Sequence, residues 1–309
     1  MRIGTMLSMP GDNSGVTALV ERAAAAEAAG FASVWLPQVF TIDALTILAL
    51  AGAATRTIEL GTAVVPTYLR QPIALATQAL TVQDATRNRL ALGIGLSHKF
   101  VIEDMFGLDY SKPIRHMKDY LTILNGLLAG ERVQHKGAEY AVSAQVAVPG
   151  TKRPPVIVAA LGPAMLKLCG RLADGTLTWM GGIDYLRDIA IPTMSAAATA
   201  ATRAAPRFVA MVPTLLTANV AAGRDAVNTT FAMYGQVPSY RATLDRGGAS
   251  NPADVAVIGN EAAIEAGMKA YANVGVTDFV AVVPMNAPET KATMEFVATC
   301  ARSKRTPTA

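Results

Sequence analysis

The residues best suited to chemistry in this chain stand together after one short apolar run, "LGIGL". Ser97, His98 and Lys99 follow it directly. Backbone N–H groups beside a hydroxyl and an ammonium group can hold a phosphate, and an imidazole can donate or accept a proton near neutral pH. The glycines of the run, Gly93 and Gly95, have a second interpretation, because glycine also relieves crowding inside a strand. The sequence alone leaves both interpretations open.

Two more polar side chains follow apolar runs. Gln38 comes after "SVWLP", and its amide could hydrogen-bond a ligand or substrate. Tyr68 comes after "IELGTAVVPT", where it could shape a pocket or donate its hydroxyl. His98, Gln38 and Tyr68 are therefore the candidate catalytic residues, with a turn or packing role as the alternative for each. We interpret His116 and His135 as structural.

Other kinds of catalytic site find little support at these positions, which contain almost no carboxylates. There is no pair of acids for glycoside hydrolysis, no His/Asp/Glu cluster with metal-ligand spacing and no Ser/His/Asp arrangement. We predict no metal site. Small, apolar and amide-bearing residues with several glycines suit a flat aromatic ligand that brings its own chemistry.

These candidates must be positioned by the regular elements of the chain. Eight apolar, strand-like runs alternate with amphipathic helical patterns, at 2–7, 33–38, 58–65, 89–96, 155–161, 175–180, 207–218 and 278–284. Strands that are apolar throughout are typical of parallel sheets covered by helices. The pattern predicts an α/β fold, a (β/α)8 TIM barrel forming a single domain over 1–309. Insertions are expected after strand 4, at about 99–150, and after strand 7, at 224–260.

Composition narrows the functional classes. The net charge of +4 is scattered along the chain, so nucleic acid is not expected as a partner. Mean hydropathy is +0.32, yet the sequence contains no uninterrupted apolar run of the length that a membrane span needs. Two cysteines far apart in sequence, and no signal-like N-terminus, favour a cytoplasmic protein that acts on a small-molecule substrate.

Nearly the whole chain resembles the bacterial luciferase-like superfamily. The strand-two segment is "AEAAGFASVWLPQVFTIDALTILALAGAATRTIELGT", and the strand-three to strand-four core is "GTAVVPTYLRQPIALATQALTVQDATRNRLALGIGLSHK". The segment from strand five to strand six is "PVIVAALGPAMLKLCGRLADGTLTWM". Within the superfamily, the chain is most similar to the coenzyme F420-dependent oxidoreductases of actinobacteria, although flavin mononucleotide (FMN) users share the scaffold. The resemblance also implies a homodimer.

The resemblance implies where a cofactor would lie. A non-proline cis peptide bond, here Ala63–Val64, would form a bulge that supports the ring from behind. The phosphate and tail would lie at the loop after strand four, and the polar edge of the ring near strand five. The cofactor-binding residues implied, with Gln38 and Lys99 added from the reasoning above, are Gln38, Thr62, Ala63, Val64, Val65, Gly95, Leu96, Ser97, His98, Lys99, Ala160, Leu161 and Gly162.

One departure from the family pattern limits the choice of reaction. Relatives that oxidise alcohols or sugar phosphates carry an Asp-His pair after strand two, and the matching positions here are Gln38 and Val39. The glutamate that those relatives carry after strand four matches Ser97 or His98. This departure counts against an alcohol dehydrogenase, because the usual proton-transfer group is missing. The resemblance as a whole still implies hydride transfer between the deazaflavin C5 of F420 and an organic substrate. An FMN-dependent monooxygenase and a cofactor-binding protein without catalysis are the alternatives.

Overall fold

Eight parallel strands close into a barrel in a computed structural model that describes residues 1–9, 12–38, 40, 42–285 and 287–305. Each strand pairs with its neighbours in chain order, and β1 closes the barrel by pairing with both β2 and β12. The barrel strands are β1 (Arg2–Met6), β2 (Ser33–Leu36), β3 (Glu59–Thr62), β5 (Leu90–Gly95), β8 (Val156–Ala159), β9 (Gly175–Trp179), β10 (Arg207–Leu216) and β12 (Asp278–Val282). All eight predicted strands are confirmed, and so is the (β/α)8 barrel.

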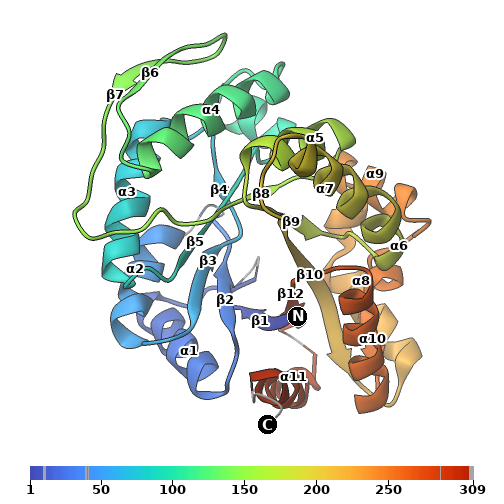
Figure 1. Ribbon diagram of the computed structural model, residues 1–309. Coiled ribbons are helices and arrows are strands. Elements are labelled where there is room, and N and C mark those ends of the chain that lie inside the picture. Colours follow the sequence, from blue (N-terminus) through green and yellow to red (C-terminus); the bar gives the residue numbers. More distant parts are fainter. Residues whose placement is uncertain (10–11, 39, 41, 286, 306–309) are drawn as a thin grey trace.

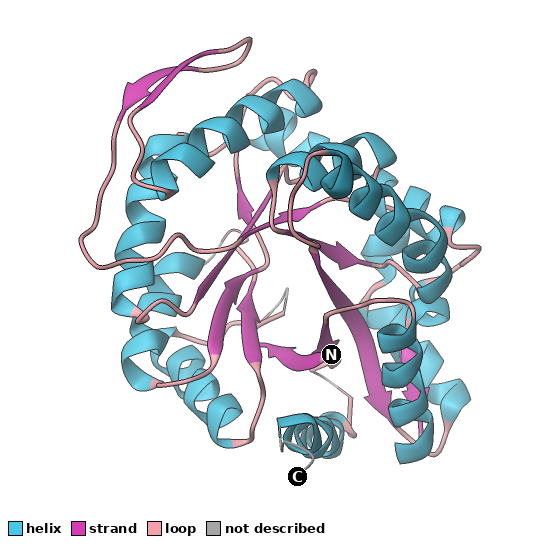
Figure 2. Cartoon of the chain, in the orientation of Figure 1, coloured by secondary structure: helices cyan, strands magenta, loops and turns pink. Residues whose placement is uncertain are grey.

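Helices surround the barrel and cover its outer face (Figure 1, Figure 2). They are α1 (Val16–Ala28), α2 (Ala44–Ala54), α3 (Pro72–Ala85), α4 (Pro113–Leu128), α5 (Pro163–Leu172), α6 (Ile183–Tyr185), α7 (Ile191–Ala200), α8 (Val220–Thr230), α9 (Pro238–Arg246), α10 (Glu261–Asn273) and α11 (Thr290–Arg305). Local sequence explains several helix ends. Asp43 caps α2 by accepting the Thr46 N–H at 2.8 Å, and Gly30 ends α1 at a φ of +92° that favours glycine.

Two hydrophobic cores follow from this arrangement. One lies inside the barrel and contains Trp35, Ile157, Leu177, Val209 and Val280. The other lies between the strands and the helices and is larger, because every strand also sends side chains outward to the helix ring. Strands buried on both faces need apolar residues at nearly every position, which is why the eight runs were readable in the sequence.

The insertion after strand four contains one element that belongs to the ring. The π-helix η1 (Val101–Met105) follows β5, and α4 then packs between α3 and α5 as the fourth ring helix. Only the antiparallel hairpin of β6 (Val133–Lys136) and β7 (Ala141–Ala144) stands outside the ring, next to α4 (Figure 1). A large part of the range 99–150 therefore belongs to the helix ring of the barrel and not to an insertion.

The insertion after strand seven is mostly helical. The 3-10 helix η3 (Ala232–Gly235) and α9 follow α8, and η4 (Pro252–Val255) leads into β11 (Val257–Gly259). β11 pairs in parallel with the end of β10.

Two local features lie outside the insertions. A second π-helix, η2 (Leu186–Ala190), links α6 to α7. The run predicted as one strand at 58–65 is divided into β3 and the short β4 (Val65–Pro66).

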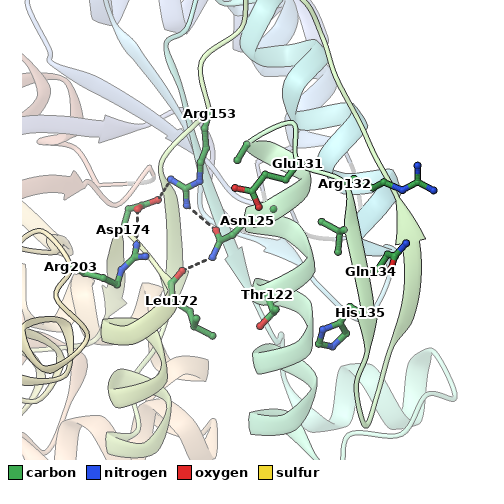
Figure 3. A pocket seen from close by; sticks show the side chains of 13 residues that line it. Thr122, Asn125, Glu131, Arg132, Gln134, His135, Arg153, Leu172, Asp174 and Arg203 are labelled. Atoms are coloured by element: carbon green, nitrogen blue, oxygen red, sulfur yellow. Dashed lines mark hydrogen bonds and ion pairs between the residues drawn. The ribbon is translucent and has the colours of Figure 1, made fainter.

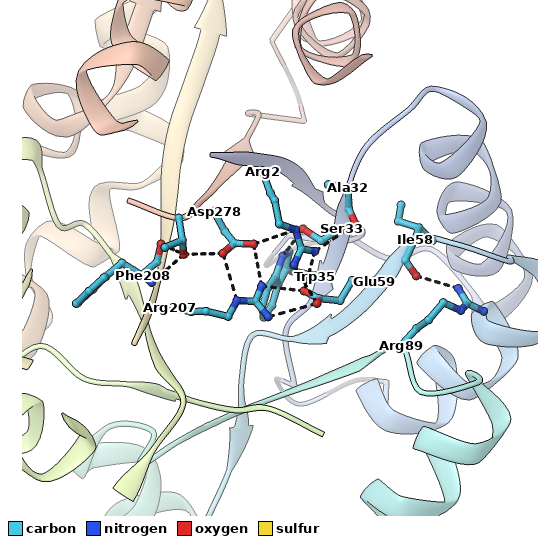
Figure 4. Close-up of polar contacts among 11 residues, drawn as sticks. Arg2, Ala32, Ser33, Trp35, Ile58, Glu59, Arg89, Arg207, Phe208 and Asp278 are labelled. Atoms are coloured by element: carbon cyan, nitrogen blue, oxygen red, sulfur yellow. Dashed lines mark hydrogen bonds and ion pairs between the residues drawn. The ribbon is translucent and has the colours of Figure 1, made fainter. Parts of the chain in front are cut away.

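A network of charges closes the N-terminal end of the barrel (Figure 4). Its four members are the first residues of four strands: Arg2, Glu59, Arg207 and Asp278. Arg207 reaches Glu59 at 2.9 Å and Asp278 at 2.8 Å, while Arg2 reaches the same two carboxylates at 3.0 and 3.4 Å. Burial disfavours the charge on Arg207, but the two carboxylates outweigh it and raise the pKa of the guanidinium.

Candidate active site at the barrel mouth

The C-terminal end of the barrel, which we call the mouth, is where sites lie in this fold. At the mouth, β3 ends at Thr62 and β4 begins at Val65, and the peptide bond between Ala63 and Val64 is cis. The Thr62 hydroxyl donates to the Gly93 carbonyl at 2.7 Å and accepts from the Gly93 N–H at 2.8 Å. The expected bulge is therefore present and is fastened to the neighbouring strand β5.

The two glycines of β5 make room for this bulge. A Cβ at Gly93 would lie 1.8 Å from the Thr62 carbonyl oxygen, and a Cβ at Gly95 would lie 2.6 Å from Val64 Cγ2. Real Cβ atoms do not approach other atoms so closely. Of the two interpretations of these glycines, relief of crowding is the one that these distances explain.

The floor of the mouth is made by apolar and aromatic side chains that pack on the interior core. They are Met6, Met9, Ala63, Val64, Trp179, Tyr234 and Tyr240. Trp179 meets Phe231 and Tyr234 edge to face, at centroid distances of 5.2 and 5.3 Å. Its indole N–H is buried, and no acceptor for it exists among the described residues. An unpartnered buried donor at the mouth favours a ligand that carries an acceptor there.

The loop after β5 brings Ser97, His98 and Lys99 to the rim. Ser97 adopts a φ of +62°, which is uncommon for serine. The His98 ring stacks on Phe100 at 5.8 Å and meets the edge of Tyr240 at 5.3 Å. Burial lowers the pKa of His98, so its imidazole is neutral at pH 7. Lys99 is exposed and pairs with Glu103 at 3.6 Å.

A cavity of about 510 Å³ opens between this loop and the start of α9. It is lined by Ser97, His98, Lys99, Phe100, Glu103, Asp104, Tyr110, Val237, Pro238 and Ser239. Three of the predicted site residues thus share one cavity. The residues from 237–239, together with Tyr234 and Tyr240, were not predicted. The aromatic residues between β10 and η4 are the signal that could have suggested them.

Gln38 and Tyr68 are not among the residues that line this cavity, although Tyr68 packs on Tyr110, which does, at a centroid distance of 5.3 Å. Gln38 Oε1 accepts the Ala44 N–H at 2.8 Å, so half of its amide is engaged at the start of α2. The Tyr68 ring stacks on His116 at 3.8 Å, and its hydroxyl is buried without a partner among the described residues. Val39, the position that matches the histidine of the family pair, lies outside the described residues.

His116 links the mouth to the outer hairpin. Its Nε2 lies 2.8 Å from Thr67 Oγ1, and its Nδ1 lies 3.4 Å from the Tyr140 hydroxyl. Burial lowers the pKa of His116 to about 4. His135 lies 3.3 Å from Asp119. These contacts agree with the structural role predicted for both histidines.

The predicted strand-five positions lie where β8 leads into α5. Ala160 is buried, and Leu161 accepts a hydrogen bond from the Tyr185 hydroxyl at 2.5 Å through its carbonyl. Gly162 is the residue before the first turn of α5 and has open space around its Cα. The Gly162 carbonyl accepts the Leu166 N–H at 2.9 Å, so what this segment offers at the edge of the mouth is space beside a glycine.

A second cavity, of about 540 Å³, lies among α4, β6 and the residues that precede β8 and β10 (Figure 3). Arg153 and Arg203 point toward Asp174, which they reach at 2.8 and 3.0 Å. Arg153 also donates to Asn125 at 2.8 Å. The charges of Arg153, Arg203 and Asp174 therefore satisfy one another and do not call for a charged ligand.

Two further properties of the described residues bear on function. In the part of the chain that the structure describes, no three His, Cys, Asp or Glu side chains gather as a metal site would require. None of the helices among the described residues has the length and apolar character to cross a bilayer.

The eight-stranded barrel, the bulge after β3 and the cavity at the mouth are features by which a class of protein can be identified. Comparison with known sequences identifies that class. The sequence model of the luciferase-like monooxygenases matches residues 1–278. The chain therefore belongs to the luciferase-like monooxygenase family.

Individual relatives are more distant. An uncharacterised protein of Mycobacterium tuberculosis is 28% identical over 243 residues, which is 74% of this chain and 71% of that protein. The F420-dependent glucose-6-phosphate dehydrogenase of Microbacterium testaceum is 33% identical over 144 residues, or 45% of this chain and 43% of the enzyme. A solved F420-dependent secondary alcohol dehydrogenase superposes with a TM-score of 0.80 at 16% identity, covering 97% of this chain and 98% of that one.

Proposed function

We propose that this protein is an oxidoreductase that binds coenzyme F420 at the mouth and transfers a hydride between the cofactor and an organic substrate. The observation that carries the proposal is the apolar C-terminal end of the barrel, where Ala63 and Val64 pack on the same interior core as Trp179. The names of the relatives support F420 as the cofactor, because the dehydrogenase of Microbacterium testaceum and the superposed alcohol dehydrogenase both depend on it.

The residues present fit a flat tricyclic ring. The bulge from Thr62 to Val65 would support one face of the ring, and the unpartnered Trp179 N–H could donate to an acceptor on its edge. The segment Ala160, Leu161 and Gly162 would meet the polar edge of the ring. The loop residues Gly95, Leu96, Ser97, His98 and Lys99 would hold the phosphate. When bound, the cofactor supplies the redox chemistry, which is hydride transfer at C5 of the deazaflavin.

The chain's own share of the reaction is orientation and exclusion of water. Gln38 has no acid–base chemistry, and its carbonyl oxygen already accepts from Ala44. His98 is neutral at pH 7, and burial raises the pKa of Tyr240 so that its hydroxyl stays protonated. Without a carboxylate-activated histidine after β2, the chain is better suited to reducing a substrate than to removing a proton from an alcohol.

A cofactor titration tests the proposal. We expect the chain to quench the fluorescence of F420 with saturable binding and to bind FMN at least tenfold more weakly. The Trp179→Phe variant should bind F420 about five- to tenfold more weakly, the effect of one lost hydrogen bond. Trp35→Phe, in the interior core, is the control and should retain the affinity of the wild type. Tight binding of FMN without binding of F420 would overturn the proposal.

The second candidate is an FMN-dependent monooxygenase, favoured by the description of the family model itself. It predicts a yellow protein on purification and oxygen consumption in the presence of a flavin reductase. A third outcome, binding of F420 without turnover across a broad substrate panel, would identify a cofactor-binding protein without catalysis.

A further inference from the structure

Exposed apolar side chains gather around the mouth. Large apolar residues are normally scattered over a protein surface, so a local concentration is informative. Among the described residues, most exposed large apolar side chains follow the C-terminal ends of barrel strands: Phe40, Leu69, Phe100, Met105, Phe106, Leu108, Met233 and Met285.

One part of this set, which we call the apolar rim, comes from the loop after β2 and the two ends of η1 and consists of Phe40, Phe100, Met105 and Phe106. Its residues are 58%, 47%, 56% and 42% exposed. Phe40, from the loop after β2, stacks on Phe106 at a centroid distance of 6.4 Å. Phe100 lines the cavity at the mouth and stacks on His98. The apolar rim therefore starts inside the cavity and continues outward to the loop after β2.

The π-helix η1 fixes this surface in place. Val101 and Ile102 are buried and anchor the segment, whereas Phe100 and Met105, at either end of it, face outward. The outward exposure is thus a property of an ordered segment. The rim side chains carry no hydrogen-bonding group apart from the weakly accepting methionine sulfur. A polar ligand laid over them would lose water without gaining partners.

We propose that the substrate is a neutral molecule with a large apolar part, which lies on the apolar rim while its reactive end reaches the floor of the mouth. The inference rests on the proposed function and adds the chemical class of the substrate. The size of the rim favours a small molecule. Four half-exposed side chains provide on the order of 400 Å², about half of the roughly 800 Å² that each partner contributes to a stable protein interface.

Binding of Nile red, a neutral fluorescent dye, tests the rim without any cofactor. The double variant Met105→Ser, Phe106→Ser removes apolar surface outside the cavity, and Leu50→Ser is the matched control because Leu50 is 46% exposed on α2. We expect the double variant to bind the dye at least tenfold more weakly and Leu50→Ser to bind it as the wild type does. Equal loss in both variants, or no loss in either, would overturn the inference.

A homologous series of 2-ketones from butanone to octanone sharpens the test. On the wild type, displacement of Nile red should improve by up to about fourfold per methylene, the factor expected for each buried CH₂. On the double variant the dependence on chain length should be much weaker. A flat series on the wild type contradicts an apolar substrate.

Two further measurements identify other occupants of the rim. A dimer in sedimentation that dissociates in the double variant would assign the rim to a second copy of the chain. Flotation with phosphatidylcholine vesicles that the double variant abolishes would assign it to a lipid surface. Either result overturns the inference. Failure of F420 to bind, with the ketone series intact, would overturn the proposed function and leave the apolar rim standing.

Discussion

The two ends of the barrel differ in the kind of side chain that forms them. At the N-terminal end, four strands begin with charged residues whose ion pairs lie between 2.8 and 3.4 Å. At the mouth, strands end in side chains such as Met6 and Trp179, and the Trp179 N–H has no partner among the described residues. The charged groups of one end pair with each other, whereas the other end keeps one buried donor, the Trp179 N–H, without a partner among the described residues. The difference separates stability from function along a single axis.

The largest expected effect of breaking this comparison lies at the N-terminal end. Arg207→Met would leave the half-exposed Arg2 as the remaining ion-pair partner of Glu59 and Asp278 within this network. We expect a loss of about 3–5 kcal/mol in the free energy of unfolding, since one member of a buried charge network is removed. Urea unfolding measures it. The folded variant should bind F420 within twofold of the wild type, and a large loss of affinity would show that the two ends are not independent.

At the mouth, the substitution expected to cost most is Gly93→Ala. Its Cβ would meet backbone at Thr62, which cannot move aside, so we expect a loss of about 2–3 kcal/mol together with weaker F420 binding. Gly95→Ala should cost less, because the atom it meets belongs to the Val64 side chain. Gly15→Ala, where the Cβ would meet nothing within 4 Å, is the control. Equal losses of stability at all three positions would show that crowding at the bulge is not their cause.

A third prediction concerns Glu27, which supports the N-terminal side of β3. Its carboxylate accepts the backbone N–H groups of Arg56, Thr57 and Ile58 at 2.9, 2.6 and 2.9 Å. Burial raises the pKa of this carboxyl, but the three donors prevail and lower it to about 2. Glu27→Gln should cost about 1–2 kcal/mol at pH 7, as measured by urea unfolding.

The sign of the pH dependence follows from that shift. The stabilisation by Glu27 is complete above the unfolded value of 4.5 and is lost as the pH falls toward 2. The difference between the wild type and Glu27→Gln should therefore shrink below pH 4.5. The exposed Glu21→Gln on the same helix is the control, and a difference that does not depend on pH would contradict the prediction.

The smallest effect is expected at His98. Because burial lowers its pKa below 6.5, its contribution to stability is present above pH 6.5 and is lost as the pH falls below that value. His98→Phe keeps an aromatic ring between Phe100 and Tyr240 and should change stability at pH 7 by less than about 0.5 kcal/mol. An NMR titration of the imidazole gives the midpoint directly. A midpoint above 6.5 would mean that a carboxylate faces the ring.

The sequence was most informative where the environment is uniform. Strands buried on both faces require apolar residues along their whole length, so the eight runs and their order could be read without a structure. The bulge followed from the resemblance, and its glycines were recognisable as positions with little space. The helix within 99–150 was also visible, but its place between α3 and α5 depends on packing that periodicity does not encode.

The mouth was harder to predict because distant segments build it. Tyr240 comes from the insertion after β10 and meets His98 across more than 130 positions of sequence, and Tyr234 packs on Tyr240, so no spacing in the sequence connects them. Gln38 remains a predicted contact of the ring or substrate. Its carbonyl oxygen accepts the first N–H of α2, which engages one half of the amide. An amide near a helix start can serve the helix, and the sequence does not say which use prevails.

The packed interior of the barrel has a kinetic consequence. Because side chains fill the interior, no molecule can pass along the barrel axis, and two ligands that share the mouth must lie one above the other. If the cofactor lies on the floor of the mouth, it has to bind first and leave last. Steady-state kinetics should then follow a compulsory order, in which excess substrate traps the cofactor beneath it.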